Sequence, residues 1–312
     1  MKTSECYLPE GSYTALPEVR QALSSLDGLR RAQDEGMILE AVAQRCTAAH
    51  DLLFDFGFAE GIMPRSCGAL GVAEGDTREI AILSRVGKPT CFVVTEIDES
   101  ADVPVVWLSR TIAQQRAQDY FLDTLHPGDV IPATVTHLEN FGAFVDIGCG
   151  VASLIGIENL SVSRIFHPSD RLRVGQRICA AVRTVEPAAR RVSLTHRELL
   201  GTWEQNAALF SPGETVRGVV RSVEPYGVFI ELAPNLSGLA EPRGDLAPGT
   251  IVSVYIKSIL PQRMKIKLTV IDVLAPSAEP DPPPYFITDD HIDEWIYTPP
   301  CCDRKYIATV FQ

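Results

Sequence analysis

The feature that most constrains the fold of this chain is an internal repeat. The stretch PGDVIPATVTHLENFGAFVDIGCGVASLIGI, which begins at Pro127, is echoed by PGETVRGVVRSVEPYGVFIELAPNLSGLAEP, which begins at Pro212, 85 residues later. Farther along, LRVGQRICAAVRTVEPAARRVSLT is echoed by LAPGTIVSVYIKSILPQRMKIKLT at a spacing of 74. A chain that repeats itself in this way folds as successive copies of one structural unit.

Each copy is predicted to form short strands that are rich in β-branched residues and separated by turns that contain Gly, Pro and Asn. In the better defined copy we expect strands at residues 130–135, 143–147, 152–157, 177–185 and 191–195. Five strands in about seventy residues suit a small Greek-key barrel of the OB type. An Ig-like sandwich needs about seven strands and more residues, so it fits less well.

A more degenerate copy precedes these two, because VGKPTCFVVTEI from Val86 matches VGQRICAAVRTV from Val174. We therefore predict an all-β chain of three tandem five-stranded OB barrels, with an N-terminal helix and short helical linkers. An amphipathic helix is expected to begin at Pro17, with apolar residues on one face. The predicted segments are an N-terminal helical segment (1–35), a degenerate barrel (36–124), a barrel (125–200), a helical linker (201–210), a barrel (211–275), and a Pro-rich hinge with an acidic tail (276–312).

The charge of the chain is unevenly distributed. The formal net charge is −12, of which −8 falls on residues 1–124 and −5 on residues 276–312, whereas the middle is close to neutral. No apolar run approaches the length of a membrane span, and the first residues show no signal-peptide core. The eight cysteines have no metal-binding spacing. We expect a cytoplasmic protein with free thiols, no metal, no cofactor and no membrane partner.

The motif GDVIPATVTHLENFGAFVDIGCGVASLIGIENLS, followed by VGQRICAAVRTVEPAARRVSLT, resembles the S1 RNA-binding domain of ribosomal protein S1. The tandem arrangement is similar to short bacterial homologues of that protein. This resemblance implies OB barrels that bind single-stranded RNA, with messenger RNA as the ligand and translation or messenger RNA handling as the setting. It also makes the small ribosomal subunit a candidate partner.

The resemblance further implies a set of RNA-binding residues: two aromatics on strand two, a His on strand three, and an acid and an Arg flanking the turn into strand five. In the second copy these positions hold Phe141, Phe144, Glu186 and Arg191, with Gly156 in place of the His. In the third copy they hold Tyr226, Phe229 and Lys265, with Leu260 in place of the acid and Glu241 in place of the His. The carboxylate of Glu241 predicts weaker binding by the third copy. In the first copy the positions hold His50, Leu53 and Val105, so no ring pair is expected there.

The residues themselves pose a question about Phe141 and Phe144. Side chains that are three apart in a strand point to opposite faces, which would leave one ring without a partner. A bulge at Gly142 would bring both rings to one face. Such a pair is a platform for stacked bases, worth about 1–3 kcal/mol per base.

Two other function classes remain open. The chain could be a protein-interaction scaffold of OB barrels that has largely lost RNA binding, which the first copy and the acidic tail favour and the second copy does not. It could also be a nuclease or another RNA-processing enzyme. The cluster HIDEW at residues 291–295, His167 and His196 are the candidate residues, but none has the spacing of a known catalytic motif. We therefore predict no enzymatic activity and no catalytic residue.

Overall fold

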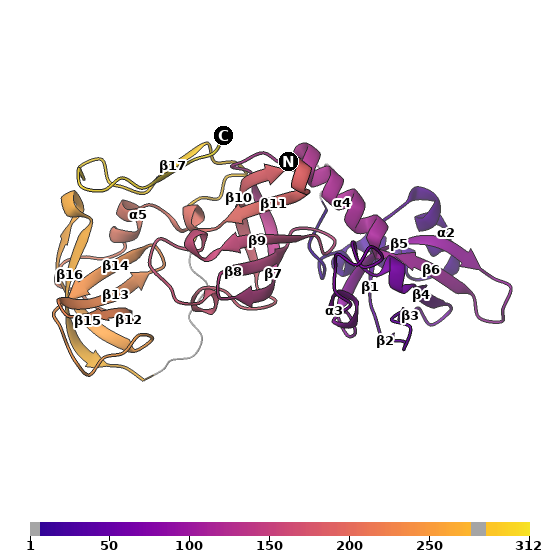
Figure 1. Ribbon diagram of the computed structural model, residues 1–312, viewed down its shortest axis with the longest axis horizontal. Coiled ribbons are helices and arrows are strands. Elements are labelled where there is room, and N and C mark those ends of the chain that lie inside the picture. The colour runs from indigo at the N-terminus through magenta and orange to yellow at the C-terminus, as the bar shows by residue number, and fades with distance from the viewer. Residues whose placement is uncertain (1–6, 276–284) are drawn as a thin grey trace.

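The structure is a computed structural model that describes residues 7–275 and 285–312. The chain forms a row of three β-domains (Figure 1). They are a first domain built on β1–β6, a second barrel built on β7–β11 and a third barrel built on β12–β16. The predicted all-β class with tandem OB-type barrels is confirmed. The predicted Pro-rich hinge falls largely on residues 276–284, which lie outside the described residues.

The second barrel is a closed five-stranded sheet in the order β10-β11-β9-β8-β7. Its interior is filled by alternate residues such as Val145, Ile155 and Leu194, which are fully buried, whereas the intervening Phe144, Leu154 and Ser193 are partly exposed on the outer face. The expected strands differ from the observed ones mainly in the first, which runs four residues farther. The strands are β7 (Val130–Glu139), β8 (Gly142–Asp146), β9 (Ala152–Gly156), β10 (Arg177–Glu186) and β11 (Arg191–Thr195).

The third barrel closes in the equivalent order, β12-β13-β14-β16-β15. The first strand of each barrel contains a register shift against the second strand, between Val135 and His137 in one and between Val220 and Ser222 in the other. The repeat in the sequence is therefore a repeat of the pairing pattern. The strands are β12 (Thr215–Glu224), β13 (Gly227–Ala233), β14 (Leu236–Ala240), β15 (Ile251–Leu260) and β16 (Lys265–Val273).

The first domain follows the same path with one interruption. Its sheet has the order β1-β5-β6-β4-β3-β2, and its two edge strands are consecutive segments of the chain separated only by residues 43–44. Together they take the place that β7 holds in the second barrel, so the sheet curls without a continuous first strand. The strands are β1 (Leu39–Val42), β2 (Arg45–Cys46), β3 (Leu52–Asp55), β4 (Glu60–Met63), β5 (Pro89–Asp98) and β6 (Val105–Ser109).

Helices cover and connect the first domain. The amphipathic segment that begins at Pro17 is two helices, α1 (Pro17–Ala22) and α2 (Leu26–Glu35), because the side chain of Ser25 caps a new helix by accepting the N–H of Gly28. A short helix, α3 (Ile80–Leu83), follows in the loop before β5. The sequence did not predict α4 (Arg110–Thr124), which leads from β6 to the second barrel.

A buried ion cluster joins the first domain to the second barrel. The carboxylate of Glu10 accepts hydrogen bonds from Arg110 (Nε to Oε1, 2.7 Å) and Arg85 (Nη1 to Oε2, 2.5 Å), and the backbone N–H of Glu10 donates to Asp146 of the second barrel at 2.7 Å. Burial raises the pKa of Glu10, but the guanidiniums of Arg110 and Arg85 more than offset burial and hold the pKa below its ordinary value. Glu10 is thus charged and fully paired at the junction.

Two ion pairs, Arg171 with Glu231 and Asp170 with Arg221, and a hydrogen-bond network around Asn235 join the second barrel to the third. The buried amide of Asn235 donates to the carbonyls of Arg197 (2.7 Å) and Gly201 (2.8 Å), and its oxygen accepts the N–H of Val162 (2.8 Å). Between these residues lies α5 (Trp203–Ala207), a five-residue helix that a Thr202–Gln205 capping box begins. One side chain therefore ties a loop of the second barrel, the linker and the third barrel together.

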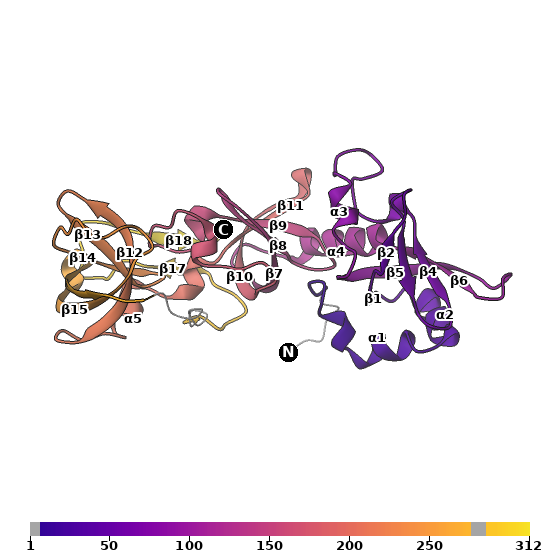
Figure 2. The same cartoon turned by 90° about the horizontal axis from the view of Figure 1, so that it is seen from below.

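The last described segment, residues 285–312, packs against both barrels. It contains the antiparallel strands β17 (Glu294–Ile296) and β18 (Ala308–Val310), the C-terminal hairpin, which lies along the region between the two barrels in Figures 1 and 2. His291 bonds Asp129 of the second barrel (Nδ1 to Oδ1, 2.7 Å), and the hydroxyl of Tyr297 donates to the carbonyl of Asn235 of the third barrel at 2.6 Å. This segment, expected as an acidic tail, holds the two barrels together.

Candidate nucleic-acid interface

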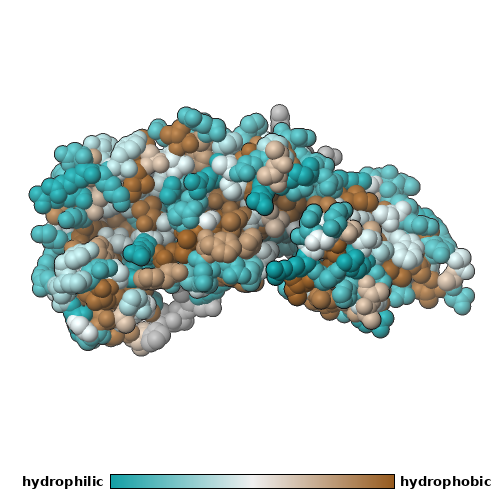
Figure 3. All heavy atoms as spheres, viewed as in Figure 1, coloured by the Kyte–Doolittle hydropathy of each residue, from teal (hydrophilic) through white to brown (hydrophobic). Residues whose placement is uncertain are grey.

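The two phenylalanines of the second barrel lie together on its outer surface. Phe141 is 56% exposed, and Phe144 is partly buried. Their ring centroids are 5.9 Å apart with an edge-to-face angle of 87°, an arrangement that aromatic pairs prefer. Figure 3 shows hydrophobic residues exposed over the middle of the molecule, where β7 and β8 lie in Figure 1. Neither ring belongs to the buried core.

The predicted role of Gly142 is wrong. The pairing of β8 with β9 is continuous through Gly142, which lies opposite Gly156, so no bulge occurs there. A Cβ atom at Gly142 would lie 2.4 Å from the carbonyl oxygen of Ile155, so this position admits only glycine because the two backbones come close. Phe141 reaches the same side as Phe144 because it precedes β8, in the turn after β7, and is not bound by strand alternation.

The register of strand pairing shows that Phe144 belongs to a row of neighbouring residues that crosses four strands. Phe144 lies opposite His137 on β7 and Leu154 on β9, and Leu154 lies opposite Ser193 on β11. The ring centroid of His137 is 6.3 Å from that of Phe144. His137 therefore adds a third ring to the surface. The sequence analysis missed it, and only the pairing of β7 with β8 identifies it.

The two predicted charged residues lie at one end of this surface. Glu186 and Arg191 are opposite each other in the pairing of β10 with β11, and both are exposed. Arg191 is two residues from Ser193 on the same strand, so it faces the side that carries Phe144. A cation at the edge of an aromatic platform can contact the phosphates of a strand whose bases stack on the rings.

The third barrel repeats the surface with different charges. Tyr226 is 67% exposed, and its ring centroid is 6.2 Å from that of the partly buried Phe229, again edge to face. The row across the strands ends at Lys267, where the second barrel has Ser193. The predicted Lys265 lies two residues away on the same strand and is exposed. Lys267 is a second cation on this surface that the sequence analysis missed.

The carboxylate of Glu241, which was expected to weaken the third barrel, has a partner. The ammonium of Lys257 donates to Glu241 at 3.0 Å. A similar pair occurs in the second barrel, where Arg183 lies 3.6 Å from Glu158. The negative charge that was expected to repel phosphate is thus offset by a neighbouring lysine, and Lys265 and Lys267 add positive charge.

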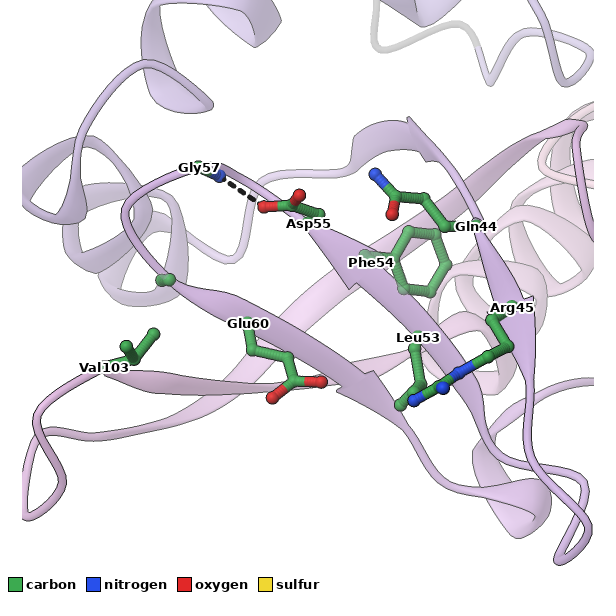
Figure 4. Close-up of a pocket in the computed structure, with 9 residues that line it drawn as sticks. Gln44, Arg45, Leu53, Phe54, Asp55, Gly57, Glu60 and Val103 are labelled. Carbon is green, nitrogen blue, oxygen red and sulfur yellow. Dashed lines mark hydrogen bonds between the residues drawn. The ribbon is translucent and has the colours of Figure 1, made fainter.

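The first domain lacks this surface. His50 lies in the turn before β3 and bonds Glu79 (Nδ1 to Oε2, 3.0 Å), and the row across the strands consists of Arg45, Leu53, Ile62 and Trp107. The adjoining pocket has a volume of about 510 Å³, and its lining includes Asp55, Glu60 and Arg45. Figure 4 shows the carboxylate of Asp55 turned to Gly57, whose backbone N–H it accepts at 2.7 Å. Two carboxylates against one guanidinium make this pocket unfavourable for phosphate.

The histidines considered for catalysis have structural roles. His291 bonds Asp129, the ring nitrogen of His167 accepts the N–H of Ser169, and His196 is buried against the hydroxyl of Tyr285 at 3.1 Å. Burial lowers the pKa of His196 to about 4. Among residues 7–275 and 285–312, no three His, Cys, Asp or Glu side chains are placed to hold a metal ion. No helix in the described part of the chain is long and apolar enough to cross a membrane.

Comparison with known proteins agrees with this geometry. The family described as the S1 RNA binding domain matches residues 124–197, the second barrel. Small ribosomal subunit protein bS1 of Staphylococcus haemolyticus is 35% identical over 181 residues, which are 53% of this chain and 46% of that protein. The bS1 homolog of Bacillus subtilis is 29% identical over 198 residues, which are 59% of this chain and 52% of that protein. The chain thus spans about half the length of the curated relatives it matches.

Solved structures match smaller parts of the chain. A chain of the a/eIF2alpha–aDim2p–rRNA complex from Pyrococcus horikoshii is 26% identical, with a TM-score of 0.24, and the match covers 27% of this chain and 51% of that chain. This likeness is too local to add to the argument. The S1 RNA binding domain family thus matches residues 124–197, in a chain that is similar over about half of its length to small ribosomal subunit protein bS1.

Proposed function

We propose that this chain binds single-stranded RNA on the outer faces of the second and third barrels. The observation that carries the proposal is the exposed pair of aromatic rings that recurs one repeat later, Phe141 with Phe144 and Tyr226 with Phe229. Rings on a barrel surface with cations beside them suit unpaired bases and their phosphates. The match of the S1 RNA binding domain to the second barrel supports the proposal.

The natural ligand in this proposal is messenger RNA, and the setting is translation in the cytoplasm. The relatives named bS1 are proteins of the small ribosomal subunit, which makes that subunit the proposed partner. The first domain has a structural role in the proposal, because its equivalent surface lacks a ring pair and its pocket is acidic. In this proposal the protein acts by binding alone, and the three histidines considered for catalysis, His167, His196 and His291, are held in structural contacts.

Titration of the full chain with a fluorescent oligonucleotide tests the proposal. We expect micromolar affinity for unstructured RNA and weaker binding to a duplex of the same sequence, because paired bases cannot reach the rings. About two to four phosphates are neutralised, so the logarithm of the affinity should fall with the logarithm of salt concentration with a slope of about −1.5 to −3.

Two controls accompany the titration. Samples incubated with and without magnesium should contain intact RNA on a denaturing gel, and cleavage that one carboxylate substitution removes would show an enzyme instead. Equal affinity for duplex and single strand would reject the aromatic platform. Absence of binding to either would favour the interaction scaffold.

A further inference from the structure

The ring pair of the third barrel forms one wall of a groove that other parts of the chain complete. The groove has a volume of about 400 Å³ and is lined by a loop of the second barrel, by the third barrel, by the linker, and by the C-terminal hairpin with the loop between its strands. We call it the interbarrel groove. Small-ligand sites range from about 300 to 1,000 Å³, so the interbarrel groove is large enough to enclose part of a bound strand.

Two cations that line this groove come from outside the third barrel. Arg164 belongs to the loop that follows β9 of the second barrel, and Lys305 belongs to the loop between β17 and β18. Both are exposed, and neither forms an ion pair with a carboxylate in the described part of the chain. Arg164 lies over the exposed ring of Phe166, with its Cζ atom 5.7 Å from the ring centroid. Both charges are therefore available to a ligand.

The other charged residues in the groove do not cancel this pair. Arg221 is held by Glu231 (Nε to Oε2, 2.8 Å) and Asp170 (Nη1 to Oδ1, 3.1 Å), so its charge is already neutralised. Glu224 is the one carboxylate among the lining residues. The two available cations thus outnumber the carboxylate, in a chain whose formal net charge is −12. This local excess favours an anionic occupant.

The hairpin that carries Lys305 is fixed in place. The carbonyl of Tyr297 accepts the N–H of Trp203 at 3.1 Å. On β18 the hydroxyl of Thr309 accepts from Arg197 (Nη2, 3.1 Å) and donates to Glu198 (2.7 Å). Figure 2 shows both strands of the hairpin between the second and third barrels. Because the loop is anchored on both sides, Lys305 is positioned before any ligand arrives.

We propose that the interbarrel groove is a composite RNA site, in which a single strand stacked on Tyr226 and Phe229 has its phosphates contacted by Arg164 of the second barrel and Lys305 of the hairpin. This inference rests on the proposed function. Aromatic rings next to unpaired cations are the combination that single-stranded nucleic acid requires. The hairpin is accordingly part of the RNA-binding surface as well as a clamp between the barrels.

The test measures the affinity of full-length variants for a fluorescent single-stranded RNA of about 16 nucleotides, the upper end of the site size of one OB barrel. All variants carry Phe144→Ala, so that binding by the third barrel dominates. Arg164→Ala and Lys305→Ala should each weaken binding about two- to fivefold, the range of an exposed ion pair. Each should also reduce the salt slope by about 0.7, the contribution of one phosphate contact on a single strand.

Arg304→Ala is the matched control, because Arg304 is the exposed neighbour of Lys305 but does not line the groove. It should leave affinity and salt slope unchanged. If Arg164→Ala and Lys305→Ala behave like Arg304→Ala while Phe144→Ala alone weakens binding, the composite site is wrong and the proposed function stands. A Phe144→Ala background without any RNA binding also overturns the composite site. A wild-type chain that does not bind RNA overturns both.

Discussion

The first domain and the third barrel flank the same central barrel, and they differ in both junction and surface. At the first junction the ion pairs of Glu10 with Arg110 and Arg85 lie within the first domain, and the backbone N–H of Glu10 donates to Asp146 of the second barrel. The third barrel is attached by the hydrogen bonds of the neutral Asn235 side chain and by two ion pairs that cross between the barrels, Arg171 with Glu231 and Asp170 with Arg221. The third barrel keeps a ring pair on its outer face, whereas the first domain has Leu53 at the corresponding place.

This difference shows which residues the OB fold requires. The strand order of the three units is nearly the same, because it depends on inward-facing residues such as Leu52 and Phe54 in the first domain and Val145 in the second barrel. Outward residues do not contribute to that core, so the surface can change from aromatic to acidic while the pairing persists. The fold therefore does not by itself predict RNA binding in each copy.

The largest effect is expected at the junction between the first domain and the second barrel. Glu10→Gln leaves two buried guanidiniums without their carboxylate, and breaking a buried ion pair costs about 3–5 kcal/mol of unfolding free energy. We expect the lower end, about 3 kcal/mol, since Asp146 remains as a second carboxylate near Arg110. Denaturant titration measures the loss. Glu18→Gln, an exposed change on α1, is the control, and equal midpoints for the two variants would mean that the cluster does not stabilise the junction.

The second junction should be sensitive to acid. Burial holds the pKa of His196 at about 4, below its ordinary value of 6.5. Between these values the unfolded chain binds a proton that the folded chain does not, so stability falls as pH falls from about 6.5 to 4 and then levels off. The loss should be roughly 3 kcal/mol.

Denaturation at a series of pH values measures this loss. His196→Gln removes the titrating group and should flatten the dependence on pH. His126→Gln, at an exposed histidine, should keep the dependence of the wild type. A His196→Gln chain with an unchanged acid slope would contradict the assignment of the slope to His196.

Substitutions on the outer surfaces should change stability least. Their effect on RNA affinity should differ clearly between the second barrel and the first domain. Phe144→Ala should weaken RNA binding by about 1–3 kcal/mol, or about 5- to 150-fold, with under about 1 kcal/mol lost in stability. Leu53→Ala in the first domain should not alter RNA affinity. Fluorescence titration and a melting curve for each variant separate the two effects. A Phe144→Ala chain that melts much earlier but binds normally at low temperature would return the ring to the core, where the cost is about 3–5 kcal/mol.

The sequence by itself determined the class, the tandem arrangement and the ring pairs. Hydrophobic residues at every second position indicate which residues of a strand face inward, and comparison of the repeats shows which outward-facing residues recur. For this reason strand β11 is found at its expected bounds, and Phe141 and Tyr226 are found exposed on equivalent turns. These features depend on residues close together in the chain or on a direct comparison of its copies.

Only the tertiary structure decided how the parts meet. His137 and Lys267 join the proposed RNA-binding surfaces through pairing with neighbouring strands, and the sequence of a single strand does not show which strands it pairs with. Glu10 and Arg110, or Asp129 and His291, are brought together from positions 100 and 162 residues apart. Such contacts leave no local periodicity, because they arise when separately folded units pack against each other. The glycine at position 142 illustrates the same point, since the backbone of another strand, and not a local bulge, requires it.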